Sequence, residues 1–86
     1  MSTLLPDWLM NNYLKLFREL KTDEFVYLEI SEILKEKDLR KVGLIISLLK
    51  RKGWATVKSQ KKDKRKKIYK LRSYRTVIEE IMEGLK

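Results

Sequence analysis

A helical run that ends at a glycine and leads directly into two strand-like segments is the feature that most constrains the fold. Apolar side chains recur at helical spacing over residues 38–52: Leu39, Val42, Ile45, Ile46 and Leu49. Asp38 is a suitable N-cap, and the last turn is basic and followed by Gly53, as is typical of helix ends. The segments 54–59 and 66–72 alternate as strands do, around a lysine-rich tip. The pattern predicts a helix followed by a β-hairpin.

Two helices and a short extended segment are expected before this unit. Residues 6–21 carry one apolar stripe at helical spacing, made of Leu9, Tyr13, Leu16, Phe17 and Leu20. Residues 25–28 are aromatic and β-branched, and the run is too short for a helix, so a short strand or extended segment is expected there. Residues 29–36 predict a short amphipathic helix with its acids outward.

A last helix is expected after the hairpin, beginning at Ser73 or Thr76. Residues 76–79 fit a capping box, and an apolar stripe follows the helical period: Ile78, Ile81, Met82 and Leu85. That stripe could dock on the first helix of the same chain or on a second copy. Trp8, Trp54 and Tyr69 are expected to pack in the core.

The predicted fold class is mainly α with a small β-hairpin (α+β), in one domain over residues 1–86. Its order is helix, strand, helix, helix, strand, wing, strand, helix. Two helices joined by a tight turn and followed directly by a hairpin describe a winged helix-turn-helix, whose second helix enters the major groove of DNA.

Positive charge is concentrated in the same unit. From Lys58 to Arg72 there are nine basic residues and one acid, Asp63, and the formal net charge of the chain is +9. Residues 39–75 hold 15 basic residues and one acid, whereas residues 1–38 hold 5 and 8. A field segregated in this way steers a polyanion to one face. A solvated hairpin tip that keeps the protein soluble and protects a sheet edge is the alternative.

The run D-L-R-K-V-G-L-I-I-S-L-L-K-R-K-G-W, with the later K-K-D-K-R-K-K-I-Y-K-L, resembles winged-helix transcription regulators of the MarR-like type. It is similar also to the winged-helix domains attached to some archaeal nucleotidyltransferases. The resemblance covers roughly residues 25–72. It implies a transcription regulator, and a homodimer formed by the N- and C-terminal helices. It also implies that Asp63 orients Arg65 toward the minor groove. The tip has no glycine or proline and is otherwise all lysine, which favours diffuse phosphate contact.

The predicted DNA-binding residues fall into two groups. On the recognition helix, about residues 38–52, they are Arg40, Lys41, Leu44, Ser47, Lys50 and Arg51. On the wing, about residues 58–67, they are Lys58, Lys61, Lys62, Asp63, Lys64, Arg65, Lys66 and Lys67. Arg40 and Ser47 are the candidates for contact with base edges, because arginine can bind guanine bidentately and serine can donate or accept. The remaining cations are expected to meet phosphates.

Leu44 and Leu48 leave alternatives open. Leu44 lies on the outer face of the recognition helix with Leu48 beside it. Leu44 could contact a thymine methyl group, the two could form an apolar patch that binds a protein, or the flanking strand could cover one of them. A protein-interaction module in replication, transcription or a toxin–antitoxin pair, and a structured-RNA binder, therefore remain alternatives to duplex DNA binding.

Composition argues against other classes. The chain has no cysteine and no histidine, which excludes disulfides, the common zinc patterns and histidine-based catalysis. Glu29, Glu32 and Glu36 lie on one helical face and indicate a solvated surface, so no enzyme activity, cofactor, metal or small-molecule ligand is expected. No apolar run approaches the roughly 18–20 residues of a membrane span, and no signal peptide is recognised, so a cytoplasmic location is expected. The excess of Lys, Glu and Ile is shared by thermophilic proteins and by proteins of AT-rich genomes.

Overall fold

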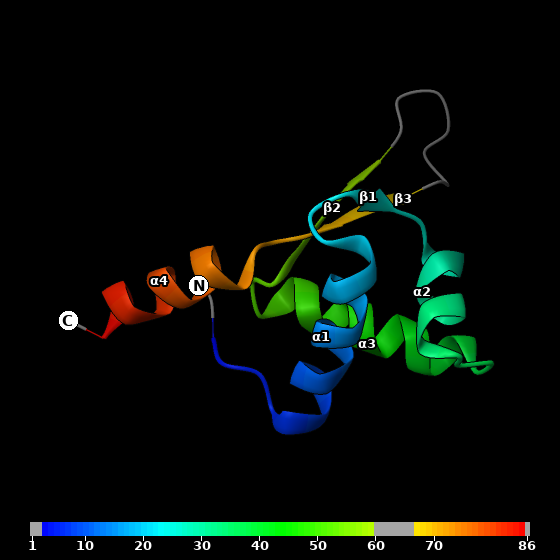
Figure 1. The fold of residues 1–86 in the computed structure, drawn as a ribbon, viewed down its shortest axis with the longest axis horizontal. Helices are drawn as coiled ribbons and strands as arrows, with labels where there is room; N and C mark the ends of the chain where they lie inside the picture. The colour runs from blue at the N-terminus through cyan, green and yellow to red at the C-terminus, as the bar shows by residue number, and fades with distance from the viewer. Residues whose placement is uncertain (1–2, 60–66, 86) are drawn as a thin grey trace.

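The three-stranded sheet lies at one end of a group of helices (Figure 1). The computed structural model describes residues 3–59 and 67–85. Within those residues the chain forms four helices and one antiparallel sheet of three strands. In chain order the elements are α1 Asp7–Leu20, β1 Glu24–Phe25, α2 Tyr27–Leu34, α3 Leu39–Arg51, β2 Ala55–Ser59, β3 Lys67–Leu71 and α4 Tyr74–Gly84. The expected α+β class is confirmed.

The sheet has the strand order β1-β3-β2, so β3 is central. Tyr69 of β3 lies opposite Val57 of β2 on one side and opposite Phe25 of β1 on the other. The rings of Phe25 and Tyr69 stack with centroids 5.9 Å apart. Tyr69 packs partly buried against the core, as expected for the returning strand.

Helix α3 forms as its sequence predicts. The Asp38 carboxylate accepts a hydrogen bond from the Arg40 backbone N–H at 3.0 Å, which satisfies a free donor of the first turn. The buried residues of the helix are Val42, Ile45, Ile46 and Leu49. Gly53 follows with φ of 86°, a left-handed conformation in which a side chain would be strained. Leu39 departs from the expected stripe, because it occupies the first position of the helix and is 49% exposed.

The core is centred on Trp54 and Tyr13, whose rings meet edge to face with centroids 5.0 Å apart. The polar atom of each buried ring also makes a hydrogen bond. The Trp54 indole N–H donates to the Thr3 carbonyl oxygen at 2.7 Å, and the Tyr13 hydroxyl donates to the Arg72 carbonyl oxygen at 2.6 Å. These bonds fix the N-terminal segment and the end of β3 to the same core.

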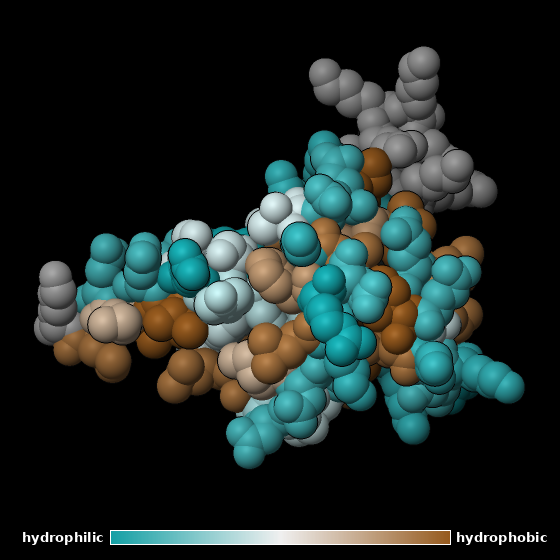
Figure 2. All heavy atoms as spheres, in the orientation of Figure 1, coloured by the Kyte–Doolittle hydropathy of each residue, from teal (hydrophilic) through white to brown (hydrophobic). Residues whose placement is uncertain are grey.

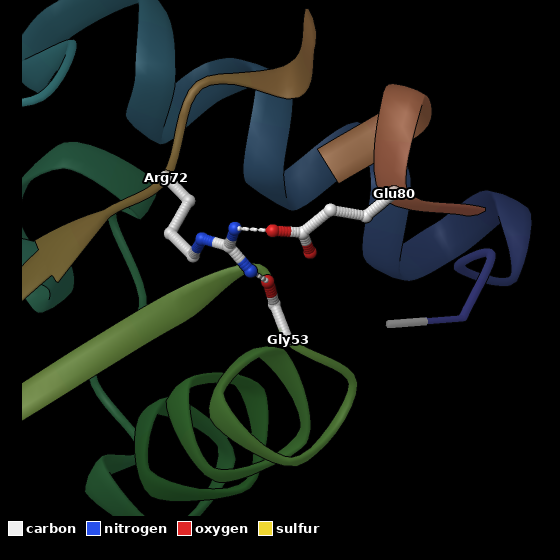
Figure 3. A network of polar contacts seen from close by, with 3 residues as sticks. All are labelled: Gly53, Arg72 and Glu80. Atoms are coloured by element: carbon white, nitrogen blue, oxygen red, sulfur yellow. Dashed lines mark hydrogen bonds and ion pairs between the residues drawn. The ribbon is translucent and has the colours of Figure 1, made fainter. Parts of the chain in front are cut away.

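Helix α4 extends away from the other elements (Figure 1) and is joined to them through Arg72 (Figure 3). The Arg72 guanidinium donates to the Gly53 carbonyl oxygen at 2.9 Å and forms an ion pair with Glu80. Hydrogen bonding to Glu80 raises the pKa of Arg72. Within α4, Val77 is fully buried, and Tyr74 contacts the ring of Phe17 on α1 edge to face at 5.7 Å.

The start of α2 differs from the sequence prediction, and the start of α4 matches one of the two expected alternatives. Only Glu24 and Phe25 form the first strand, and α2 begins at Tyr27 after the N-cap Val26. The Glu29 carboxylate accepts from the Val26 backbone N–H, which favours this early start. Of the two N-caps expected for α4, the structure has Ser73, and the helix begins at Tyr74. Residues 76–79 therefore lie inside the helix and form no capping box.

Trp8 was expected in the core and is 48% exposed. The buried row of α1 is Leu9, Tyr13 and Leu16, and Trp8 lies a quarter-turn from that row.

Most of the apolar stripe of α4 is also exposed: Ile78, Met82 and Leu85 remain open to solvent, and Ile81 packs partly against the core.

Candidate nucleic-acid interface

All six side chains that were predicted on α3 are exposed, but they do not share one surface: Ser47 and Lys50 lie toward the hairpin, and Lys41 and Leu44 lie toward α1. Arg40, Lys41, Leu44, Ser47, Lys50 and Arg51 are exposed. The opposite face of the helix is fixed in the core by Val42, Ile45, Ile46 and Leu49, so the exposed side chains project from a rigid support.

A cleft joins this face to the β-hairpin. It has a volume of about 190 Å³. Its lining comes from α2, α3, β2 and β3: Tyr27, Gly43, Ile46, Ser47, Lys50, Val57, Lys67 and Tyr69. Lys50 of α3 and Lys67 of β3 are far apart in sequence and line the same cleft, together with Ser47 of α3. Two ammonium groups and a hydroxyl beside one groove can bind an anionic oxygen such as that of a phosphate.

Tyr27 shapes the wall of this cleft. Its hydroxyl donates a hydrogen bond to the Leu39 carbonyl oxygen in the first turn of α3. The ring crosses α3 at Gly43, where an added β-carbon would lie 2.8 Å from the Tyr27 hydroxyl oxygen. An alanine at position 43 would therefore displace the Tyr27 hydroxyl group. The sequence prediction missed Tyr27, although a glycine in the middle of an otherwise regular helix was a signal for a close neighbour.

Two of the predicted wing residues, Lys58 and Lys67, lie in the part of the hairpin that the structure describes. The Lys58 ammonium forms an ion pair with the Glu24 carboxylate, with Nζ and Oε1 2.6 Å apart. Hydrogen bonding to Lys58 lowers the pKa of Glu24, and the charge of the same lysine adds to the effect. The charge of Lys58 is thus partly neutralised by Glu24 of β1. Lys67, in contrast, lines the cleft. The other predicted wing residues lie outside the described residues: Lys61, Lys62, Asp63, Lys64, Arg65 and Lys66.

Leu44 belongs to a second, more apolar groove on the other side of α3. This groove has a volume of about 310 Å³ and is lined by Trp8, Asn12, Leu34, Glu36, Lys41, Leu44 and Ile45. Leu44 is 54% exposed, and Leu48 packs partly buried against the core. The exposed apolar pair on this surface is therefore Leu44 with Trp8 of α1. Leu48 is partly covered, which fits the alternative that one of the two leucines is covered.

Metal-binding clusters and membrane spans are both missing from the described part of the chain. Residues 3–59 and 67–85 contain no group of three or more histidine, cysteine, aspartate or glutamate side chains placed to hold a metal ion. Among the helices of the same residues, none has the length and apolar character needed to cross a bilayer.

Comparison of the chain with protein-family models, with curated proteins and with solved structures finds no match.

Proposed function

We propose that this chain is a winged helix-turn-helix domain that binds duplex DNA and regulates transcription. In this proposal α2 and α3 form the helix-turn-helix, and β2 and β3 form the wing. Helix α3 enters the major groove, which is about 12 Å wide and admits one helix. The wing follows the backbone or the minor groove.

The observation that carries the proposal is the cleft shared by α3 and the hairpin. It supports a binding surface in which Lys50 and Lys67 contact phosphates from two elements. Arg40 and Ser47 are proposed to meet base edges, and Arg51 a phosphate. The basic tip from Lys61 to Lys67 supplies further affinity that does not depend on sequence.

The test is fluorescence anisotropy of the full chain with a mixed-sequence duplex, titrated from low to physiological salt. With roughly three to five phosphates per chain, log K should fall against log[salt] with a slope of about −3 to −4.5. The variant Lys50→Ala/Lys67→Ala should flatten the slope by about 0.9 for each phosphate that the protein no longer neutralises.

A matched control separates a local effect from a change in net charge. Lys15→Ala/Arg18→Ala removes the same charge from α1, where both residues lie outside the buried row. The control should bind as the wild type does. Equal weakening by both variants, or no binding at low salt, would contradict the proposal. Tighter binding of a duplex RNA would instead favour a structured-RNA binder.

The groove beside Leu44 favours one second candidate, a protein-interaction module. Trp8 and Leu44 are both about half exposed and line the same groove, as expected for a surface that receives an apolar side chain of a partner. The two candidates differ for Leu44→Lys. An added cation on the outer face of α3 should maintain or strengthen DNA binding, whereas it should abolish binding to a protein that buries Leu44.

A further inference from the structure

The groove beside Leu44 continues along α1. One face of this helix carries side chains at intervals of three or four residues: Trp8, Asn12, Lys15 and Glu19. The first two line the groove beside Leu44, of about 310 Å³, and the last two line a hollow of about 530 Å³ between α1 and α2. Leu34 of α2 lines both spaces, which together form the α1 groove. Figure 2 shows apolar side chains between polar ones where Figure 1 places α1 beside α2.

Two half-exposed apolar side chains line one end of the α1 groove. Trp8 is 48% exposed and Leu44 is 54% exposed. The apolar group that a base pair presents in the major groove is the thymine methyl group, which is far smaller than a space of about 310 Å³. A leucine or an aromatic side chain fills such a space, and tryptophan is frequent among the residues that anchor protein interfaces. This end of the groove therefore fits a protein better than it fits DNA.

Positive charge surrounds Leu44 on α3. Arg40 and Lys41 precede it by about one turn, and Arg51 follows it by two, so all three lie on its side of the helix. Their side chains make no hydrogen bond or ion pair with any residue in the ranges 3–59 and 67–85. Cations that lack an internal partner attract carboxylates from another molecule.

Two of the acids in the α1 groove are already engaged. The Glu36 carboxylate accepts from the Asp38 backbone N–H at 3.0 Å, and Glu19 is paired with Arg18, with Oε1 and Nε 3.5 Å apart. The charged side chains of the groove that have no polar partner within the described part of the chain are three cations and one acid: Lys15, Lys35, Lys41 and Glu32. The unpaired charge along the groove is thus mainly positive.

We propose that the α1 groove binds an acidic segment of a partner protein. The segment places a large apolar side chain against Trp8 and Leu44, and carboxylates beside Lys41 and Lys15. Opposite charge also favours the encounter, because the formal net charge of this chain is +9. Such a partner rests on the second candidate function, the protein-interaction surface, and does not require DNA binding.

The groove and the proposed phosphate contacts lie on two sides of α3. Lys41 lines the α1 groove, whereas Lys50 lines the cleft beside the hairpin. At 100° per residue the two lysines point in opposite directions from the helix axis. Lys41 and Leu44 were predicted to contact DNA, and an acidic partner assigns them to a protein instead. Each surface can therefore be tested in the absence of the other ligand.

Selection from a displayed random-peptide library on the full chain tests the chemistry of the partner. The enriched peptides should share a large apolar side chain flanked by aspartate or glutamate. Leu44→Gln should no longer enrich them, because an amide replaces the apolar wall of the groove. Leu28→Gln makes the same change at a leucine that is 63% exposed on α2, and it should enrich the same peptides as the wild type.

The selection separates the acidic partner from the second candidate function. Peptides with an apolar anchor and no excess of acids would leave the groove a protein-binding site and overturn its acidic partner. Equal enrichment on the wild type and on Leu44→Gln would contradict both. Neither result depends on whether the chain binds a duplex.

Trp8 reports on the binding of an enriched peptide. Trp54 is fully buried, so a shift of tryptophan emission to shorter wavelength on adding the peptide comes from Trp8, and Trp8→Phe should lose it. Leu44→Gln should raise the dissociation constant about tenfold or more. A shift that persists in Trp8→Phe would place the peptide elsewhere on the chain and overturn the proposal.

Lys41→Gln and Lys50→Gln are a matched pair, since they remove the same charge from opposite sides of α3. Lys41→Gln should weaken the binding of the acidic peptide more than Lys50→Gln does, with the larger difference at low salt. The order should reverse for a labelled duplex if the cleft contacts phosphates. Equal weakening of the peptide by the two variants would mean that it follows net charge and does not occupy the groove.

Discussion

The Tyr27 hydroxyl group occupies the space that a side chain at Gly43 would fill. The Tyr27 hydroxyl oxygen lies 2.8 Å from the position that a β-carbon on Gly43 would occupy, and the same hydroxyl donates to the Leu39 carbonyl oxygen. A residue in the first turn of α2 is thereby bonded to the first turn of α3. The hydrogen bond therefore links α2 directly to the helix that carries the proposed DNA-binding residues.

Gly43→Ala should not stabilise the wild-type chain, although alanine is favoured over glycine inside a helix by about 1 kcal/mol. The methyl group displaces the Tyr27 hydroxyl and breaks a hydrogen bond whose net value is about 0.5–1.5 kcal/mol. In a Tyr27→Phe background the nearest remaining ring atom lies 3.8 Å from that methyl position. There Gly43→Ala should stabilise by about 1 kcal/mol. Urea unfolding of the four proteins in the cycle measures the coupling.

Gly84→Ala is the control for this cycle. Gly84 is also helical, and nothing lies within 4 Å of the position that a β-carbon on Gly84 would occupy. Its effect on the free energy of unfolding should be the same with Tyr27 and with Phe at position 27. The interpretation of Gly43 is wrong if Gly43→Ala stabilises both backgrounds equally.

Glu24→Gln should strengthen DNA binding if the hairpin contacts phosphates. The change removes a negative charge from β1 and releases the Lys58 ammonium, which lies 2.6 Å from the Glu24 carboxylate. Because both side chains are exposed and screened by solvent, the gain in affinity should be modest and largest at low salt. Anisotropy with a labelled duplex measures the change.

Glu19→Gln makes the same charge change on α1, where Glu19 is paired with Arg18 at 3.5 Å. It should alter affinity less than Glu24→Gln does. Equal gains would show that Lys58 does not act locally.

Local signals were sufficient for α3 and the hairpin. The Asp38 cap, the buried stripe and Gly53 together predicted a helix over about 38–52, and the structure has Leu39–Arg51. These signals depend on backbone geometry and on neighbours within a few residues. The exposed outer face of α3 followed from the same period, so its candidate residues could be named from the sequence.

Tertiary contacts account for what the sequence did not predict. The aromatic and β-branched run at 25–28 favours a strand, but Tyr27 reaches Leu39 only because α2 has already begun. Trp8 is apolar and yet exposed, since its place depends on which row of α1 packs against α2 and α3. The cleft between Lys50 and Lys67 depends on how α3 packs on the hairpin, and no local pattern encodes that angle.

Arg72→Lys should loosen α4. Arginine donates to the Gly53 carbonyl oxygen and to the Glu80 carboxylate from two arms of one planar fork. Lysine lacks that fork. Both side chains are partly exposed, so the expected loss is about 1–2 kcal/mol. Faster hydrogen exchange of the α4 amides would reveal it, with Arg51→Lys, at an exposed position, as the control. Unchanged exchange in α4 would mean that Val77 and Tyr74 are sufficient to hold the helix.

Stability should fall at alkaline pH because of Tyr13. Burial raises the pKa of Tyr13 to about 12, and the charge of Tyr74 acts in the same direction. An unfolded tyrosine loses its proton near pH 10. Between about pH 10 and 12 the unfolded chain therefore binds fewer protons than the folded one, and the free energy of unfolding decreases as pH rises. Below pH 10 this contribution to stability is complete.

Tyr13→Phe should separate the two roles of the hydroxyl group. Near neutral pH it should destabilise the chain by about 1 kcal/mol, because the hydrogen bond to the Arg72 carbonyl oxygen is absent from the variant. Above pH 10 the variant should lose less stability than the wild type, since one titrating group is gone. Burial also raises the pKa of Tyr69, so Tyr13→Phe/Tyr69→Phe should flatten the alkaline profile further. Urea unfolding at about pH 8, 10, 11 and 12, values that bracket the roughly pH 10 titration of free tyrosine, measures these profiles. Parallel curves of the free energy of unfolding against pH for the wild type and the variant would contradict the assignment to Tyr13.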